Sequence, residues 1–155
     1  IEVDGVDIKK NIPNWQKNIS YMPQEIYLLD DTIINNIVFD DKNIPSNEDI
    51  EKILKKLNLH DFVESLPNKY EEKLGDRATS ISGGQIKRIG LARCLSKKRQ
   101  IIILDEPTAG LDQDNSQNLI SLIKQISNEH TIIVVSHNKD FEKVSDIVIN
   151  LSSKI

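Results

Sequence analysis

The stretch Ile101-Ile102-Ile103-Leu104-Asp105-Glu106 decides the fold. Its four apolar residues, most of them β-branched, are typical of a parallel strand buried on both faces. Two carboxylates directly after such a strand lie at the carboxyl edge of the sheet, where α/β proteins bind ligands. The first can hold a hydrated Mg²⁺ and the second can act as a base on a water molecule. Two solvated acids at the start of a loop explain the segment equally well when it is considered alone.

The neighbouring segments predict that strands and helices alternate around this strand. Residues 113–128 have the apolar periodicity of a helix, and 131–135 and 146–151 are expected to be a second and a third buried strand. Upstream, residues 19–22 predict a short strand that ends at a proline, and residues 1–8 predict an edge strand and a turn. This order predicts an α/β protein whose parallel sheet has right-handed crossovers.

The middle of the chain is predicted to be an inserted helical subdomain. Helices are expected over 31–38, after the capping-box pair Ser46 and Asp49, around 61–66 and over 86–95. The predicted organisation therefore has three parts. Residues 1–26 and 98–155 form the core that contains the sheet, and residues 27–97 form the insert.

The composition is that of a globular domain and excludes several classes of function. The chain has 155 residues, of which 38% are hydrophobic and 28% charged, so it can bury a core without disulfides. Its 20 basic and 24 acidic residues give a net charge of −4, which leaves no basic footprint for nucleic acid. The one cysteine, Cys94, excludes a disulfide framework and a four-cysteine metal site. No apolar run exceeds four residues, whereas a membrane span needs about 20, so this chain is not expected to insert into a membrane.

Three further polar segments accompany the Asp105-Glu106 pair. Ser82-Gly83-Gly84-Gln85 precedes the helix predicted over 86–95, and backbone N–H groups at such a helix N-terminus favour anions such as phosphate. A serine N-cap followed by two flexible residues is the ordinary interpretation of this segment alone. Gln24 and His137 each follow a predicted strand, and either one alone is more often a surface or structural residue. The order along the chain, which is Gln, Ser-Gly-Gly-Gln, Asp-Glu, Leu-Asp and His, changes this interpretation.

That order resembles the nucleotide-binding domain of ATP-binding cassette (ABC) transporters, over essentially the whole chain. Ile81–Gln85 is similar to the family signature Leu-Ser-Gly-Gly-Gln, with Ile in place of Leu. Ile101–Glu106 resembles the Walker B strand, Leu111-Asp112 the D-loop, His137 the switch histidine and Gln24 the Q-loop glutamine. The implied fold is a partial P-loop NTPase (RecA-like) parallel sheet with an inserted α-helical subdomain.

The resemblance implies a role for each of these residues. Glu106 would be the catalytic general base or water-polarising carboxylate, and His137 would contact the γ-phosphate. Asp105 would hold Mg²⁺ through water, and Gln24 would reach both the metal and the attacking water. ATP contacts are implied for Gln24, Ser82, Gly83, Gly84, Gln85 and Asp112. The signature residues would contact ATP held by the opposite subunit, so dimerisation would be part of the active site.

The resemblance also implies partners and a location for the complete protein. Two nucleotide-binding domains would bind two ATP molecules head to tail, and hydrolysis would move a substrate across a membrane through separate transmembrane segments. The domain would then lie at the cytoplasmic face of the cell membrane, with no nucleic-acid partner. Residues 24–37, with Tyr27, Leu28 and Leu29 exposed, would face the transmembrane domain, although such a run is also typical of a core.

Three segments bear on the type of transporter. Residues 28–37 after Gln24 resemble the exporter pattern, with Leu29 in place of Phe and Asn35 in place of Glu. Residues 66–77 also resemble the exporter segment that precedes the signature. Residues 105–112 resemble instead the corresponding sequence segment of importers. Together the segments favour an exporter or a flippase of lipid-linked substrates.

The phosphate-cradling loop of the family, Gly-x-x-x-x-Gly-Lys-Ser/Thr, does not occur in the 155 residues. In the family that loop precedes a segment that residues 1–8 resemble, so the chain is expected to be a domain cut just downstream of its P-loop and inactive alone. Two alternatives stay open. One is a soluble ABC-type ATPase of DNA repair or translation, although no heptad array interrupts residues 24–82. The other is a non-catalytic structural fragment.

Overall fold

A parallel sheet of three strands positions the predicted site residues. The computed structural model describes residues 1–3, 5–38, 45–74 and 81–151. The strands are β3 (Ile19–Met22), β4 (Ile101–Asp105) and β5 (Thr131–Val135), in the order β3-β4-β5. Met22 pairs with Leu104 and Leu104 pairs with Val134, so the three strands end at the same edge. The predicted α/β class and the positions of these strands are confirmed.

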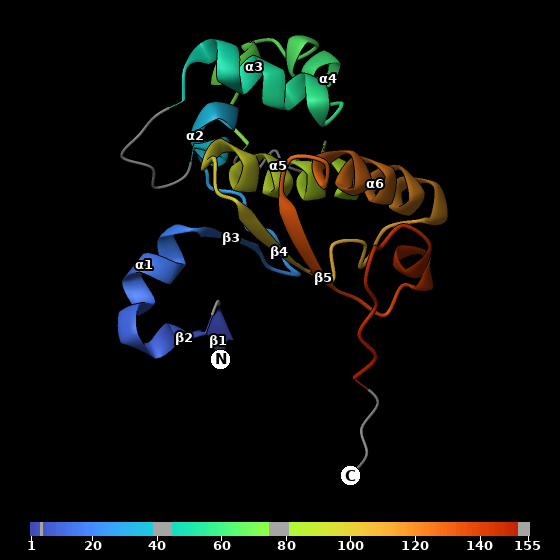
Figure 1. Ribbon diagram of the computed structural model, residues 1–155. Helices are drawn as coiled ribbons and strands as arrows, with labels where there is room; N and C mark the ends of the chain where they lie inside the picture. The colour runs from blue at the N-terminus through green and yellow to red at the C-terminus, as the bar shows by residue number, and fades with distance from the viewer. Residues whose placement is uncertain (4, 39–44, 75–80, 152–155) are drawn as a thin grey trace.

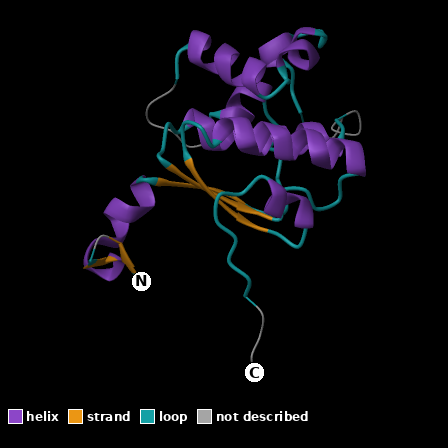
Figure 2. Cartoon of the chain, turned by 45° about the vertical axis from the view of Figure 1, so that its right-hand side comes forward, coloured by secondary structure: helices purple, strands orange, loops and turns teal. Residues whose placement is uncertain are grey.

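Two long helices cover one face of this sheet, as Figures 1 and 2 show from two directions. They are α5 (Gly83–Ser96) and α6 (Gln113–Ile126). Apolar side chains from the sheet and both helices meet in one core, which includes Met22, Ile102, Leu104, Ile89, Leu119 and Ile123. Each such side chain stabilises the fold by about 1.5–3 kcal/mol when it is removed from water, so this face holds the sheet and the helices together.

Three shorter helices form a further layer on the side of α5 that faces away from the sheet (Figure 1). They are α2 (Ile33–Ile37), α3 (Asn47–Lys56) and α4 (His60–Glu64), followed by a 3₁₀ turn, η2 (Lys69–Glu71). The Ser46 half of the predicted capping box is present, because the Ser46 side chain accepts a hydrogen bond from the Asp49 N–H at 3.2 Å. In the described part of the chain, none of the helices has the length and apolar composition that crossing a membrane requires.

The first residues form a small hairpin followed by a short helix. β1 (Glu2–Val3) pairs antiparallel with β2 (Val6–Asp7), and the turn between them uses Gly5 at a φ of +74°. A 3₁₀ helix, η1 (Ile8–Asn11), leads into α1 (Ile12–Lys17), which the sequence analysis does not predict. The local signals for α1 are an N-cap at Asn11, whose side chain accepts from Asn14 N–H, and a proline in the first turn.

Two predictions about the end of the chain are wrong. The strand β5 is not buried, since Ile133 and Val135 are 50% and 54% exposed. It is one of the two edge strands of the described sheet, and no described helix covers its second face. Residues 146–151 form no strand but leave the sheet beyond η4 (Lys139–Lys143) as an exposed segment (Figure 1). Their apolar side chains suit a strand, but a strand also needs a partner for its backbone groups, and no described strand pairs with this segment.

Candidate functional site

Four of the predicted site residues lie at the carboxyl edge of the parallel sheet. Gln24 follows β3 by two residues, Asp105 ends β4 with Glu106 directly after it, and His137 follows β5 by two residues. Asp105 is in register with Val135. Because parallel strands that end in register bring their following residues to one edge, the fold gathers these side chains from segments far apart in the sequence.

Asp105 lies on the face of the sheet that α5 and α6 leave uncovered. The hydroxyl of Tyr21 on β3 donates a hydrogen bond of 2.9 Å to Asp105 Oδ2. Tyr21 pairs with Ile103, two residues before Asp105, so the two side chains share a face. This hydrogen bond and then desolvation raise the pKa of the Tyr21 phenol. Sequence reasoning missed Tyr21, because only the pairing of β3 with β4 brings it to the carboxylate.

Glu106 is held by the end of β5. Its backbone N–H donates to Val135 O at 2.8 Å, and its φ of +42° is in the left-handed region, which residues other than glycine seldom adopt. The carboxylate accepts two hydrogen bonds, one from the Ser136 hydroxyl at 3.1 Å and one from the His137 backbone N–H at 2.9 Å. These contacts fix the direction of the carboxylate. Strained backbone of this kind is concentrated at functional sites.

The imidazole of His137 approaches the same carboxylate. Its Nε2 lies 3.7 Å from Glu106 Oε1, a distance that becomes an ion pair only when the histidine is protonated. The His137 side chain is fully exposed, whereas only 19% of the Glu106 side chain is exposed. The histidine therefore lies at the surface of the edge, with the carboxylate behind it.

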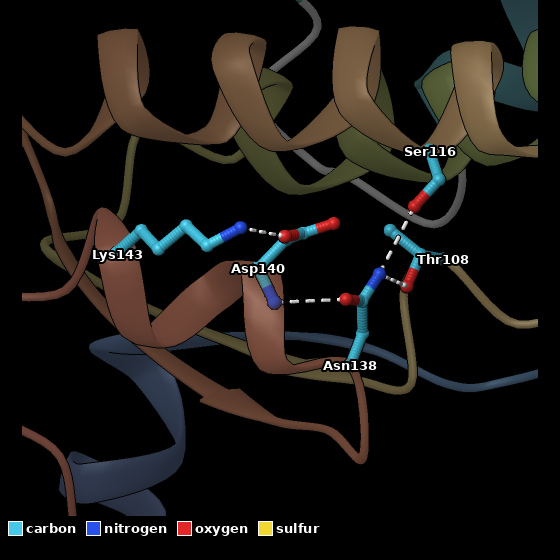
Figure 3. Close-up of polar contacts among 5 residues, drawn as sticks. All are labelled: Thr108, Ser116, Asn138, Asp140 and Lys143. Atoms are coloured by element: carbon cyan, nitrogen blue, oxygen red, sulfur yellow. Dashed lines mark hydrogen bonds and ion pairs between the residues drawn. The ribbon is translucent and has the colours of Figure 1, made fainter.

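A polar network centred on Asn138 connects the segment after β5 to the turn after β4 and to α6, as Figure 3 shows. Asn138 Nδ2 donates to Ser116 Oγ at 3.1 Å and to Thr108 Oγ1 at 3.4 Å, and both acceptor residues are buried. Asn138 Oδ1 accepts from the Asp140 N–H at 2.9 Å, and Asp140 pairs with Lys143 at 2.6 Å. These side chains, apart from Lys143, line a cavity of about 350 Å³ that Glu106 also borders. Asn138 was not predicted from the sequence. Its position directly after His137 is the feature that could have indicated it.

The Ser82–Gln85 segment begins α5 with a complete capping box. Ser82 Oγ accepts from Gln85 N–H at 3.2 Å, and Gln85 Oε1 accepts from Ser82 N–H at 2.9 Å. The Ser82 hydroxyl hydrogen is not used in the capping box. The N–H groups of Gly83 and Gly84 lie in the first turn, where a helix has no internal acceptors for them. This donor set suits an anion such as a phosphate.

The two glycines also allow close packing within the chain. A Cβ on Gly84 would lie 3.0 Å from Asn115 Oδ1, and a Cβ on Gly83 would lie 3.3 Å from Leu111 Cδ2. Asn115 is itself held by Asp112, whose carboxylate accepts from Asn115 N–H at 2.8 Å and from Asn115 Nδ2 at 2.7 Å. These hydrogen bonds lower the pKa of Asp112, which is the N-cap of α6. The start of α5 is therefore packed closely against the start of α6.

The segment after Gln24 is organised by a buried asparagine. Asn36 has no exposed surface, and its side-chain amide donates to three backbone oxygens, those of Leu29, Asp31 and Thr32. The predicted exposure is correct for Leu29 and for Tyr27, which is 84% exposed. It is wrong for Leu28, which packs against the core.

The donor atoms at the carboxyl edge suit a magnesium ion. Mg²⁺ prefers oxygen ligands and is usually bound through one or two carboxylates together with phosphate oxygens. Asp105 supplies a carboxylate, and the exposed Gln24 supplies an amide oxygen. Within the described ranges, no cluster of three or more His, Cys, Asp or Glu side chains could hold a metal ion by itself.

Comparison with known proteins identifies the family of this chain. A sequence model of the family described as ABC transporter matches residues 1–109. The chain belongs to the ABC transporter family. Domains of this family bind ATP, generally with Mg²⁺. The sheet and helices of this ABC transporter chain match part of the P-loop NTPase fold, as the resemblance implies.

Individual relatives of this ABC chain are transporters. It is 38% identical over 149 residues to the serine protease/ABC transporter B family protein tagD of Dictyostelium discoideum, covering 93% of this chain and 8% of that protein. It is 31% identical over 151 residues to an ATP-dependent lipid A-core flippase of Haemophilus influenzae, covering 96% of this chain and 26% of the flippase. The chain thus spans about a quarter or less of the length of these relatives.

A solved structure shows the same arrangement. The structure of a bacterial Atm1-family ABC exporter with ATP bound superimposes with a TM-score of 0.80 at 28% sequence identity, covering 94% of this chain and 26% of that one. The likeness therefore extends over nearly the whole of this ABC chain.

Proposed function

We propose that this chain is part of an ATP-hydrolysing domain that powers export or flipping of a substrate across a membrane. The observation that carries the proposal is the Asp105-Glu106 pair at the carboxyl edge, with the Glu106 carboxylate directed by Ser136 and the His137 backbone. The similarity to a lipid A-core flippase and to an ABC exporter supports the direction of transport. The soluble repair or translation ATPase is not favoured, because the relatives named above are a transporter, a flippase and an exporter.

In the proposed mechanism, Glu106 accepts a proton from the attacking water, and Gln24 and His137 orient that water and the γ-phosphate. Asp105 would hold Mg²⁺ through water. When bound, Mg²⁺ neutralises charge on the transferring phosphoryl group. Phosphoryl transfer depends mainly on positioning and charge stabilisation, so the fixed direction of the Glu106 carboxylate is the chain's main contribution.

The proposed partners follow from the same assignment. Ser82, Gly83, Gly84 and Gln85 would contact ATP held by a second copy of the domain, with Asp112 at the same interface. The exposed Tyr27 and Leu29 would face a transmembrane domain, which would place this domain at the cytoplasmic face of the cell membrane.

The test of the function is Glu106→Gln in the longer protein that contains this chain. The amide keeps the shape of the carboxylate but is a far poorer base, so we expect turnover to fall by roughly 10²–10⁴-fold with ATP binding nearly unchanged. The variant should also accumulate as an ATP-stabilised dimer in size-exclusion chromatography. Asp105→Asn should instead weaken Mg²⁺ dependence and nucleotide affinity together.

The matched control is Glu48→Gln, which makes the same chemical change at an exposed position in the first turn of α3. Its turnover should equal that of the wild type. Glu106→Gln turnover within about threefold of the wild type, with no trapped dimer, would show that Glu106 is an ordinary turn residue.

A further inference from the structure

A lysine on the signature helix is almost completely buried and holds the backbone of the Q-loop. Lys87 lies in the second turn of α5, and 8% of its surface is exposed. Its ammonium group donates a hydrogen bond of 2.5 Å to the backbone oxygen of Gln24, which is 63 residues away in the sequence. Lysine is almost never this buried unless its charge is paired, so the contact requires an explanation.

The ordinary explanation, in which an apolar stem packs while the ammonium reaches water, does not fit. A snorkelling lysine directs its charged end to solvent, whereas Lys87 directs it to a carbonyl. Burial lowers the pKa of Lys87, and the carboxylates of Glu106 and Glu25 act in the opposite sense. The Lys87 ammonium group therefore lies within the electrostatic reach of the Glu106 carboxylate.

A second contact one turn further along α5 restrains the same loop. A Cβ on Gly90 would lie 2.7 Å from Ile26 Cδ1 and 3.5 Å from Met22 Sδ. Lys87 and Gly90 are three residues apart and so lie on one face of the helix. Met22 and Ile26, which flank Gln24, thus pack against α5 at Gly90. Lys87 holds the backbone of Gln24 itself.

The hydrogen bond from Lys87 is made to the backbone of Gln24 and leaves the Gln24 side chain exposed. A charged donor makes a stronger hydrogen bond to a carbonyl than a neutral one, so the Lys87 contact is well suited to fix the backbone. The exposed amide is then presented from a fixed backbone position at the edge where Asp105 and Glu106 lie.

We propose that Lys87 is a positioning residue, which fixes the Gln24 backbone against the signature helix so that the Gln24 amide is set for the hydrolytic step. This inference rests on the proposed function and deepens it. It predicts that loss of the contact lowers the rate of hydrolysis while leaving ATP affinity intact, because a displaced catalytic group costs rate even when the chemistry is unchanged.

The experiment compares Lys87→Met and Lys87→Arg with the wild type in the longer protein, by steady-state Mg-ATP hydrolysis and thermal unfolding. Methionine keeps the stem but neither donates nor carries charge, and we expect kcat to fall roughly 10- to 100-fold with KM for ATP changed less than about twofold. The melting temperature should not fall, because burial of an ammonium group carries a desolvation cost that methionine does not have. Arginine keeps the charged donor and should recover most of kcat.

Two further variants complete the design. Lys52→Met makes the same change at an exposed position on α3 and should match the wild type. Lys87→Gln is neutral, and its amide nitrogen is one bond closer to its own backbone than the lysine nitrogen is. It should therefore show the same loss of kcat at constant KM. This variant replaces Lys87→Met in the test if the methionine variant folds poorly.

A kcat within about twofold of the wild type in Lys87→Met and Lys87→Gln would overturn the inference. The inference would also be overturned if Lys87→Met and Lys87→Arg lost kcat equally and both had a lower melting temperature than the wild type. That result would indicate a structural role alone. If the wild type hydrolyses ATP and Glu106→Gln does not, these outcomes overturn only the role of Lys87. Normal turnover in Glu106→Gln would overturn the proposed function together with this inference.

Discussion

The two faces of the β3-β4-β5 sheet are built differently. On one face, Met22, Ile102 and Leu104 are almost completely buried beneath α5 and α6. On the other face, Tyr21, Ile133 and Val135 are each more than 49% exposed, and no described helix covers them. Successive side chains of a strand point to opposite faces, so β4 contributes to both.

This difference separates the residues that hold the fold from those that carry the proposed chemistry. Ile102 and Leu104 of β4 belong to the core, whereas Asp105 lies on the open face and accepts the hydrogen bond from Tyr21. Glu106 follows at the edge where both faces end. The buried face thus provides a rigid base from which the two carboxylates project.

The largest expected effect concerns the isolated chain. Asp105 and Glu106 have no phosphate-binding loop beside them within the 155 residues, because the sequence has no Gly-Lys-Ser/Thr. We expect the purified chain to bind Mg-ATP poorly and to hydrolyse none above background, since positioning of the phosphates provides most of the catalysis. Calorimetric titration is the measurement, and a dissociation constant in the low micromolar range would contradict the prediction.

The second prediction compares the two faces directly. Leu104→Ala removes a completely buried side chain and should lower the free energy of unfolding by about 2–5 kcal/mol. Ile133→Ala removes a half-exposed side chain from the open face and should lower it by about 1 kcal/mol or less. Urea denaturation of the 155-residue chain measures both. Equal losses in the two variants would show that the open face is as important to stability as the buried one.

The third prediction tests how closely α5 packs on the segment after β3. Gly90→Ala places a methyl group 2.7 Å from Ile26 Cδ1, and the resulting overpacking should destabilise the chain by about 1–3 kcal/mol. Ser121→Ala on the exposed side of α6 is the control and should change stability by less than about 0.5 kcal/mol. If Gly90→Ala is as stable as the control, Ile26 moves aside without cost and the packing is looser than described.

The smallest expected effect is a pH dependence at Asp112. Its pKa is lowered in the folded chain by hydrogen bonds from Asn115, so its contribution to stability is present above the pKa of the unfolded state. That contribution is lost as the pH falls through the lowered folded pKa. The melting temperature of Asp112→Ala should therefore be below that of the wild type near neutral pH, and the two should converge in acid. A difference that stays constant with pH would mean that the charge of the cap is unimportant.

Several features of the fold and site could be predicted from the sequence because they depend on neighbouring residues. The strand 101–105 is marked by its continuous apolar run, and the starts of α3 and α5 are marked by capping residues three positions apart. The assignment to the ABC transporter family also follows from the order of short motifs, which needs no tertiary contact.

Other features were decided only by the tertiary structure. The hydrogen bond between Tyr21 and Asp105 joins residues 84 positions apart, and that between Lys87 and Gln24 joins residues 63 positions apart. No local sequence pattern predicts such contacts. The apolar run Ile147-Val148-Ile149 illustrates the converse: its composition suits a strand, but a strand forms only where another backbone offers hydrogen bonds. Periodicity and capping are properties of neighbouring residues and can be recognised in a sequence. Burial of each sheet face, and the partner of each polar side chain, depend instead on which distant segments the fold brings together.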